Sequence, residues 1–117
     1  MKNRPFLQRL VFAIDGIGSA LRHEASFRTQ AICAFLSISA FTLFKAPPIW
    51  WAFWTLCVGS VLAAELINTA LENLLDHLHP DIHPQIKIAK DCAAGAVLMM
   101  SVSSVIVFIC FLVEQFN

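Results

Sequence analysis

Residues 64–76 read AELINTALENLLD and place three carboxylates and an amide in one of the most apolar regions of the chain. At about 100° of rotation per helical residue, Asn68, Glu72 and Asp76 all return to within roughly 60° of Glu65. These polar side chains therefore share one narrow face of a helix. A carboxylate at the centre of a membrane span costs up to about 3 kcal/mol, so their alignment indicates a functional face.

The composition predicts an integral membrane protein. Of the 117 residues, 58% are hydrophobic and only 14% are charged, whereas a soluble domain of this size needs a much more polar surface. The formal net charge is zero, so no nucleic-acid partner is expected. The four cysteines lie in apolar sequence without a CxxC pair, which favours small hydrophobic residues over a metal or redox site.

Three apolar segments predict three membrane-spanning helices in one domain that covers residues 1–117. We expect the spans over about residues 28–46, 49–76 and 88–114. A segment with apolar residues at helical spacing precedes them and predicts an amphipathic helix over about residues 5–25. That helix lies on the membrane surface or packs against a partner. The predicted fold is therefore an all-α integral membrane fold with a surface helix before the spans.

The distribution of basic residues orients the chain in the membrane. Five Lys/Arg precede the first span, one separates the first two spans, two lie between spans two and three, and none follows the third. Cytoplasmic loops carry the excess of Lys and Arg. We therefore expect a multi-pass protein with a cytoplasmic N-terminus and second loop, and with Lys45 and the C-terminus outside.

The depth of the acidic face follows from the helical rise of about 1.5 Å per residue. If the second span begins at Ile49, Glu65 lies about 24 Å and Asp76 about 40 Å along it, and a hydrocarbon core of about 30 Å ends between Asn68 and Glu72. The acidic face is thus at the cytoplasmic boundary. The sequence predicts one thin layer there, with Glu65 and Asn68 just beneath it, formed by Glu24, Glu72, Asp76, Lys90 and Asp91.

These residue types predict phosphoryl transfer to a membrane lipid. Carboxylates and an amide suit Mg²⁺, a lysine suits phosphate oxygens, and a base beneath the headgroups reaches the polar end of a lipid. Polar residues in spans also hold helices together. For a single such residue the structural interpretation is preferable. Seven polar residues at about the same depth favour a functional site instead.

The quoted stretch resembles the signature E-x-x-N-x-A-hydrophobic-E-x-x-x-D of the small prokaryotic diacylglycerol kinases and their undecaprenol kinase relatives. AKDCAAGAVL (residues 89–98) and EASFR (residues 24–28) extend the resemblance over nearly the whole chain. The resemblance implies a homotrimeric lipid kinase of the prokaryotic inner membrane that uses Mg-ATP. HPQIKIAKDCAAGAVL is closer to the undecaprenol kinase branch and EASFR to the diacylglycerol kinase branch. We expect diacylglycerol as the acceptor, giving phosphatidic acid, with undecaprenol as the alternative.

The resemblance also implies roles for individual residues. Glu65 is similar to the catalytic base and contacts the lipid hydroxyl, and Arg9 stands in for a lipid-binding arginine. Glu24 and Glu72 resemble the metal-binding carboxylates. The residues expected at the nucleotide are Glu24, Asn68, Glu72, Asp76, Lys90 and Asp91.

Other motifs predict structure instead of chemistry. Residues 15–19 lack the third glycine and the lysine of a phosphate loop, so Gly16 and Gly18 are interpreted as close-packing points. His77, His79 and His83 are interpreted as neutral turn residues in preference to metal ligands. Three tryptophans follow Pro48 and suggest an aromatic belt at the outer interface. Three helices cannot enclose a nucleotide, a metal and a lipid, so we expect a site shared between subunits.

Two other classes of function compete with a lipid kinase. A small proton- or cation-coupled transporter is suggested by Glu65 within a span, although the remaining acids gather at one edge and no acidic path crosses the membrane. A non-catalytic membrane adaptor would use the amphipathic helix and small-residue faces for assembly. ATP consumption and ATP-dependent stabilisation distinguish the kinase from both.

Overall fold

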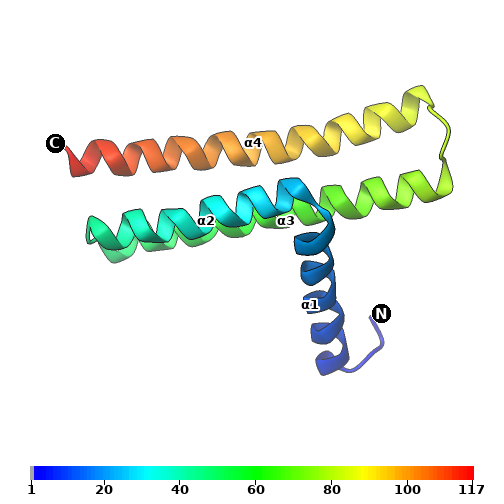
Figure 1. Cartoon of the computed structure of the whole chain (residues 1–117), viewed down its shortest axis with the longest axis horizontal. Helices are drawn as coiled ribbons and strands as arrows, with labels where there is room; N and C mark the ends of the chain where they lie inside the picture. Colours follow the sequence, from blue (N-terminus) through cyan, green and yellow to red (C-terminus); the bar gives the residue numbers. More distant parts are fainter. Residues whose placement is uncertain (1) are drawn as a thin grey trace.

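The computed structural model describes residues 2–117, and these residues fold into helices without a β-strand. In chain order the helices are α1 Phe6–His23, α2 Ala25–Leu43, α3 Pro48–Leu78 and α4 Pro84–Gln115. Helices α3 and α4 form a long antiparallel pair, α2 lies along the first part of α3, and α1 projects sideways from this bundle (Figure 1). The predicted all-α class is confirmed.

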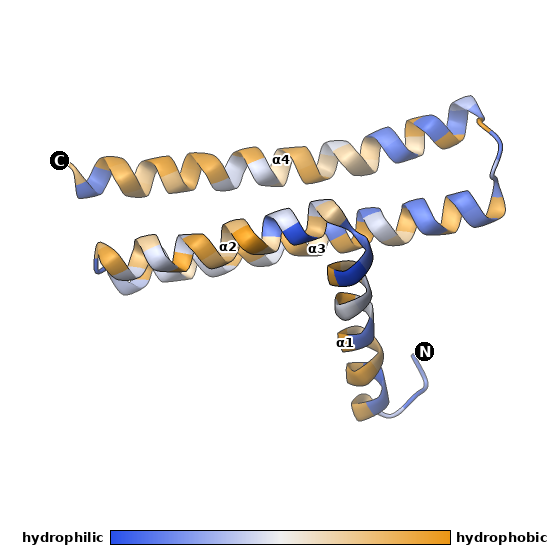
Figure 2. Cartoon of the chain, in the orientation of Figure 1, coloured by the Kyte–Doolittle hydropathy of each residue, from blue (hydrophilic) through white to orange (hydrophobic). Residues whose placement is uncertain are grey.

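Two of the helices are long and apolar enough to cross a membrane. They are α3, with a mean hydropathy of 1.5 over its most apolar window, and α4, with 2.7. Helix α2 falls short because Arg28 and Gln30 lie in its 19 residues. Apolar residues cover α2 and most of α4, whereas hydrophilic residues gather where α3 leads into α4 (Figure 2). A membrane-spanning role for α2 remains a prediction.

The α3–α4 hairpin is longer than the predicted spans. Helix α3 continues to Leu78, and α4 begins at Pro84, four residues before the predicted span. Proline is favourable at the first helical position, and the Nδ1 atom of His83 caps the helix by accepting from the Gln85 N–H at 3.1 Å. The predicted spans are shorter than the helices because an apolar run marks only the membrane core, whereas each helix continues into polar sequence.

A single extended residue makes the corner between α1 and α2. Glu24 has φ −114° and ψ 109°, and its N–H donates to the Ala20 carbonyl at 2.9 Å. Ala20 and Phe27, on either side of the corner, are buried, but the large apolar side chains along α1 are exposed. The predicted amphipathic helix is therefore present, and its apolar face is left uncovered by the rest of the chain.

The C-terminus of α2 ends in a Schellman motif. The Ala46 N–H donates to the Phe41 carbonyl at 2.9 Å, and the Lys45 N–H donates to the Thr42 carbonyl at 3.2 Å. These two bonds define the motif. Lys45 has a φ of 53°, a left-handed conformation that usually favours glycine.

Aromatic side chains pack together at the end of the bundle where α2 ends, α3 begins and α4 ends. Phe111 on α4 is fully buried, and its ring centroid lies 4.3 Å from Phe41 on α2 and 5.5 Å from Trp50 on α3. The Trp50 indole also donates to the Glu114 carboxylate. The tryptophans near Pro48 thus pack between helices at this end, in addition to any contact with the lipid interface.

The interpretation of Gly16 and Gly18 as close-packing points is wrong within one chain. A Cβ atom added at either glycine meets nothing within 4 Å. Helix α1 leaves the bundle at the corner, so no other helix approaches this part of it (Figure 1).

Candidate active site

Glu65 is the only buried charged side chain among residues 2–117, with a relative exposure of 4%. It lies one turn after buried Val61 on α3, and the Gln30 side chain of α2 lies beside its carboxylate. The Gln30 Nε2 atom also donates to the Ser101 Oγ atom of α4 at 3.0 Å. Gln30 therefore links α2 to α4 at the level of the buried carboxylate.

Two further glutamates act electrostatically on Glu65. They are Glu24, from the corner between α1 and α2, and Glu72, two turns further along α3. Asn68 lies between Glu65 and Glu72 in the sequence, and its Oδ1 atom is buried without a hydrogen-bond partner in the described part of the chain. Buried polar atoms are normally paired. An unpaired amide oxygen beside carboxylates suits a cation or a hydrogen-bond donor.

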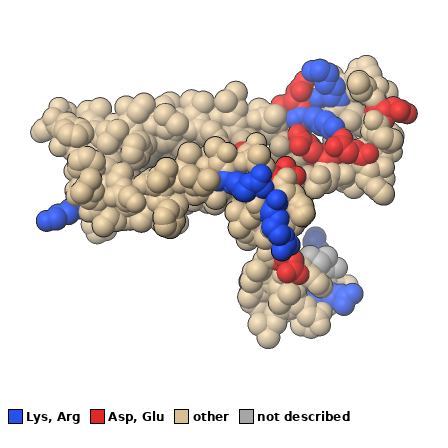
Figure 3. Space-filling model, viewed as in Figure 1, with Lys and Arg blue, Asp and Glu red and all other residues tan. Residues whose placement is uncertain are grey.

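Two lysine–aspartate pairs lie further along the hairpin. The Lys90 ammonium of α4 contacts the Asp76 carboxylate of α3, and so joins the two helices. Lys87 pairs with Asp91 one turn later in α4, with 2.6 Å between Nζ and Oδ2. The Lys90 side chain is 34% exposed, whereas that of Lys87 is 70% exposed. Acidic and basic side chains gather at this end of the bundle (Figure 3).

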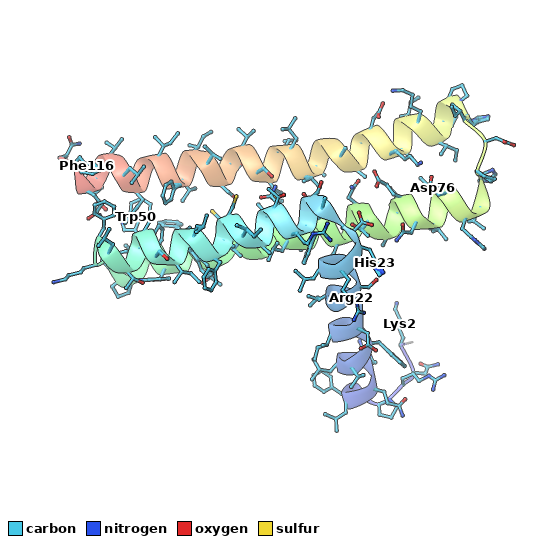
Figure 4. All side chains as sticks on the ribbon, viewed as in Figure 1. Lys2, Arg22, His23, Trp50, Asp76 and Phe116 are labelled. Atoms are coloured by element: carbon cyan, nitrogen blue, oxygen red, sulfur yellow. The ribbon has the colours of Figure 1, made fainter. Side chains whose placement is uncertain are left out.

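The predicted layer of polar residues divides into two groups. Glu24, Glu65 and Glu72 interact at the level of the α1–α2 corner, whereas Asp76 pairs with Lys90 nearer the end of the hairpin (Figure 4). Glu65 and Asp76 are separated by about 16 Å along α3. The two groups come closest at Glu72 and Asp76, which lie one turn apart on α3, about 6 Å along its axis.

Arg9 is not brought to the other predicted residues within one chain. It lies in the first turn of α1, about 22 Å along the helix from Glu24. Its side chain makes no hydrogen bond or ion pair among the residues that the structure describes. Its predicted contact with the lipid therefore requires another subunit or a different position of α1.

Sequence reasoning missed Gln30 and Arg28. Gln30 is the only amide in α2, and an amide in an apolar helix is a recognisable signal. The Arg28 guanidinium donates to the Leu21 and Arg22 carbonyls at 3.2 and 2.9 Å. The sequence gives no sign of this role, because the partners of Arg28 are backbone atoms of the preceding helix.

The donor set fits Mg²⁺ as part of a metal–nucleotide complex. No three His, Cys, Asp or Glu side chains among residues 2–117 form a metal-binding group by themselves. Mg²⁺ usually takes one or two protein carboxylates together with water and substrate phosphates. Glu24 and Glu72, with the unpaired Asn68 oxygen nearby, provide that smaller set.

Carboxylates and a lysine at one end of an apolar helical bundle are the residue types that a membrane phosphotransferase uses. Residues 11–112 match the family described as prokaryotic diacylglycerol kinase. The chain belongs to this family, and it is a lipid kinase. Family membership implies a nucleotide phosphate donor and a lipid substrate, and it argues against the transporter and adaptor interpretations.

Relatives with two different printed activities are similar to the chain. Undecaprenol kinase of Bacillus subtilis (strain 168) is 35% identical over 102 residues, which cover 87% of this chain and 83% of that protein. Diacylglycerol kinase of Synechocystis sp. is 37% identical over 102 residues, covering 86% of this chain and 58% of that protein. Diacylglycerol kinase of Helicobacter pylori (strain J99) is 30% identical over 90 residues, covering 77% and 70% respectively.

Proposed function

We propose that this lipid kinase transfers the γ-phosphate of Mg-ATP to the hydroxyl of diacylglycerol, giving phosphatidic acid. The observation that carries the proposal is the buried Glu65 carboxylate, which lies beside Gln30 and near the charges of Glu24 and Glu72. A base in this position reaches a lipid hydroxyl just beneath the headgroups, and the neighbouring carboxylates are available to a metal–nucleotide complex.

In the proposed reaction, Glu65 accepts the proton of the lipid hydroxyl as its oxygen attacks the γ-phosphorus. The bond to the β,γ-bridging oxygen breaks, and ADP leaves with that electron pair. Gln30, which lies beside Glu65, would orient its carboxylate. Glu24 and Glu72, with Asn68, would hold Mg²⁺, which neutralises charge on the transferred phosphate when bound. Positioning and electrostatic stabilisation account for most of the catalysis in phosphoryl transfer.

Lys90 is proposed to bind ATP phosphate oxygens, and Asp76 to hold Lys90 in place. The interhelical pair restricts the lysine ammonium before ATP arrives, and lysine acts as a point charge for phosphate. Asp91 directly follows Lys90 and is proposed to belong to the same nucleotide-binding residues. Arg9 is proposed to contact the lipid from a neighbouring subunit.

The proposed arrangement in the inner membrane has three spans per subunit. Helix α2 would cross beside α3, and α1 would lie on the cytoplasmic surface, with its exposed apolar face in the lipid. Phe44, next to Lys45, packs on Phe116 near the C-terminus, with 5.6 Å between the ring centroids. Lys45 and the C-terminus therefore lie at the same end of the bundle, as a three-span topology with both outside requires. A homotrimer would complete the site, because one chain leaves Arg9 remote from Glu65.

Undecaprenol is the second candidate acceptor. The match to this chain covers 83% of the Bacillus subtilis undecaprenol kinase but 58% of the Synechocystis diacylglycerol kinase, at similar identity. The two acceptors share a primary hydroxyl at the membrane surface, so the same base and metal site would serve either. The acceptor changes the apolar contacts, not the proposed chemistry.

The proposed metal role is tested by Glu72→Gln, with Glu114→Gln as the control at the opposite end of the bundle. Phosphorylation in Glu72→Gln should fall by at least about 100-fold, with an unchanged thermal unfolding midpoint, because the amide keeps the shape but binds Mg²⁺ weakly. Glu114→Gln should retain its turnover. Retained turnover in Glu72→Gln would contradict the metal role.

A further inference from the structure

The end of α1 is held by a side chain from the next helix. The Arg28 Nη1 atom donates to the Arg22 carbonyl at 2.9 Å and to the Leu21 carbonyl at 3.2 Å. The last four carbonyls of a helix have no partner within it, and the negative end of the helix dipole favours a cation there. Arg28 therefore provides a C-terminal cap for α1 from the first turn of α2.

Arg28 also makes hydrogen bonds to the backbone at Glu24 and just before it. Its backbone N–H donates to the Glu24 carbonyl at 3.1 Å, while its guanidinium holds the carbonyls two and three residues before Glu24. Glu24 is the extended residue of the corner. One arginine thus joins both helices at the residue whose carboxylate acts on Glu65.

Little else in the chain fixes the direction of α1. Ala20 is the only buried residue of this helix, and Leu10, Ile14 and Ile17 are at least 42% exposed. Arg22 and His23 lie at the corner, where α1 leaves the bundle (Figure 4). Arg28 itself makes no ion pair with an acid in the described part of the chain. Its charge is directed to backbone carbonyls and not to a carboxylate.

We propose that Arg28 is a positioning residue for Glu24: by capping α1 it sets the angle of the α1–α2 corner and so aims the Glu24 carboxylate at the metal–nucleotide complex. This inference rests on the proposed metal role of Glu24. Arginine suits the task because its Nη1 group is held in the guanidinium plane and directs its donors at two carbonyls, whereas a lysine ammonium on a flexible stem does not hold a fixed direction. A misplacement of about 1 Å in such a ligand lowers activity by up to about 100-fold.

The first test compares Arg28→Gln, Arg28→Lys and Arg22→Gln in the intact protein, with the Mg²⁺ concentration for half-maximal activity as the readout. We expect Arg28→Gln to raise that concentration by roughly tenfold or more, with Arg28→Lys in between. Arg22→Gln removes the same charge, two residues from Glu24, without removing a side-chain hydrogen bond, and should resemble the unmodified protein. An equal effect of Arg22→Gln would show that charge alone matters and would overturn the proposal.

Hydrogen–deuterium exchange of the last two turns of α1 provides a readout that is independent of activity. Exchange there should accelerate in Arg28→Gln and stay unchanged in Arg22→Gln, while α3 and α4 remain protected. Unchanged exchange in Arg28→Gln would overturn the cap. If Arg28→Gln does not fold, Arg28→Lys carries the same comparison, with one carbonyl still within reach.

Glu24→Gln separates the failure of this inference from the failure of the proposed metal role. If Glu24→Gln keeps the normal Mg²⁺ requirement, the metal role of Glu24 is wrong, and the positioning role with it, whatever the exchange data show. If Glu24→Gln is impaired while Arg28→Gln is not, only the positioning role is wrong. Parallel impairment, with faster exchange confined to Arg28→Gln, supports both.

Discussion

At the scale of single residues, the site depends on a carboxylate that has no cationic partner among residues 2–117. Glu65 is almost completely buried and lies beside Gln30 and near two other acids. Burying a charge without pairing it is costly, and proteins keep such groups mainly where they have a function. In contrast, Asp76 and Asp91 are exposed and already paired with lysines, which is more typical of binding and orientation.

Lys90 should matter more to nucleotide binding than Lys87, although both are α4 lysines paired with an aspartate. Lys90→Gln should raise the KM for ATP by roughly tenfold or more, because hydrogen bonds to charged groups contribute about 1.5–3 kcal/mol. Lys87→Gln should change it by less than about twofold, since exposed pairs one turn apart contribute little. Steady-state kinetics at saturating lipid measure both values. Similar KM values for the two variants would contradict the role of Lys90.

The shared face of Glu65, Asn68 and Glu72 was predictable because helical periodicity depends only on local sequence. The roles of Gln30 and Arg28 were not, because their partners are an α3 side chain and α1 backbone carbonyls. The prediction of a single polar layer was also too simple, because these residues form two groups. Depth counted along one helix does not show that Glu24 lies near Glu65 while Asp76 pairs across the hairpin.

At the scale of elements, the ends of the helices are determined by caps that composition does not reveal. The left-handed Lys45 at the end of α2 and the His83 cap of α4 both lie outside the apolar runs. Prolines mark the starts of α3 and α4, at Pro48 and Pro84, whereas the α1–α2 break at Glu24 has no such signal. The presence of four helices was thus predictable, but their exact ends were not.

The positive φ of Lys45 predicts how substitutions in the α2–α3 turn affect the stability of the fold. Lys45→Gly should stabilise the fold by about 0.5–1 kcal/mol, because glycine adopts a positive φ without the steric penalty of a side chain. Lys45→Gln removes the charge and keeps the penalty, so its stability should stay within about 0.5 kcal/mol of the unmodified protein. Equilibrium unfolding in mixed micelles measures the difference. A glycine variant no more stable than the glutamine variant would contradict the observed conformation.

At the scale of the whole molecule, one chain covers little of its own apolar surface. Five hydrophobic residues of the described chain are buried, whereas large side chains along all four helices are exposed. Lipid covers part of this surface in a membrane, but small residues such as Gly59 and Gly95 are also open to close approach. Arg9 lies remote from Glu65 as well, so the surface and the site both favour assembly.

The purified protein should therefore be a trimer in mild detergent. Native mass spectrometry should give a mass of three chains, and dilution into the monomeric state should abolish phosphorylation, because Arg9 would no longer be supplied by a neighbour. Refolded monomer reassembled into the trimer is the control, and its activity should return. A strictly monomeric preparation with full activity would show that one chain forms the complete site.

The most direct test of the central claim follows a γ-phosphate label from Mg-ATP into lipid, with diacylglycerol and undecaprenol presented in parallel mixed micelles. We predict that label enters diacylglycerol preferentially. In Glu65→Gln, transfer should fall by at least about 100-fold without loss of folded protein, because the base is absent. Preferential labelling of undecaprenol would correct the acceptor alone. Label in neither lipid with the folded protein, or undiminished transfer by Glu65→Gln, would contradict the account of the site.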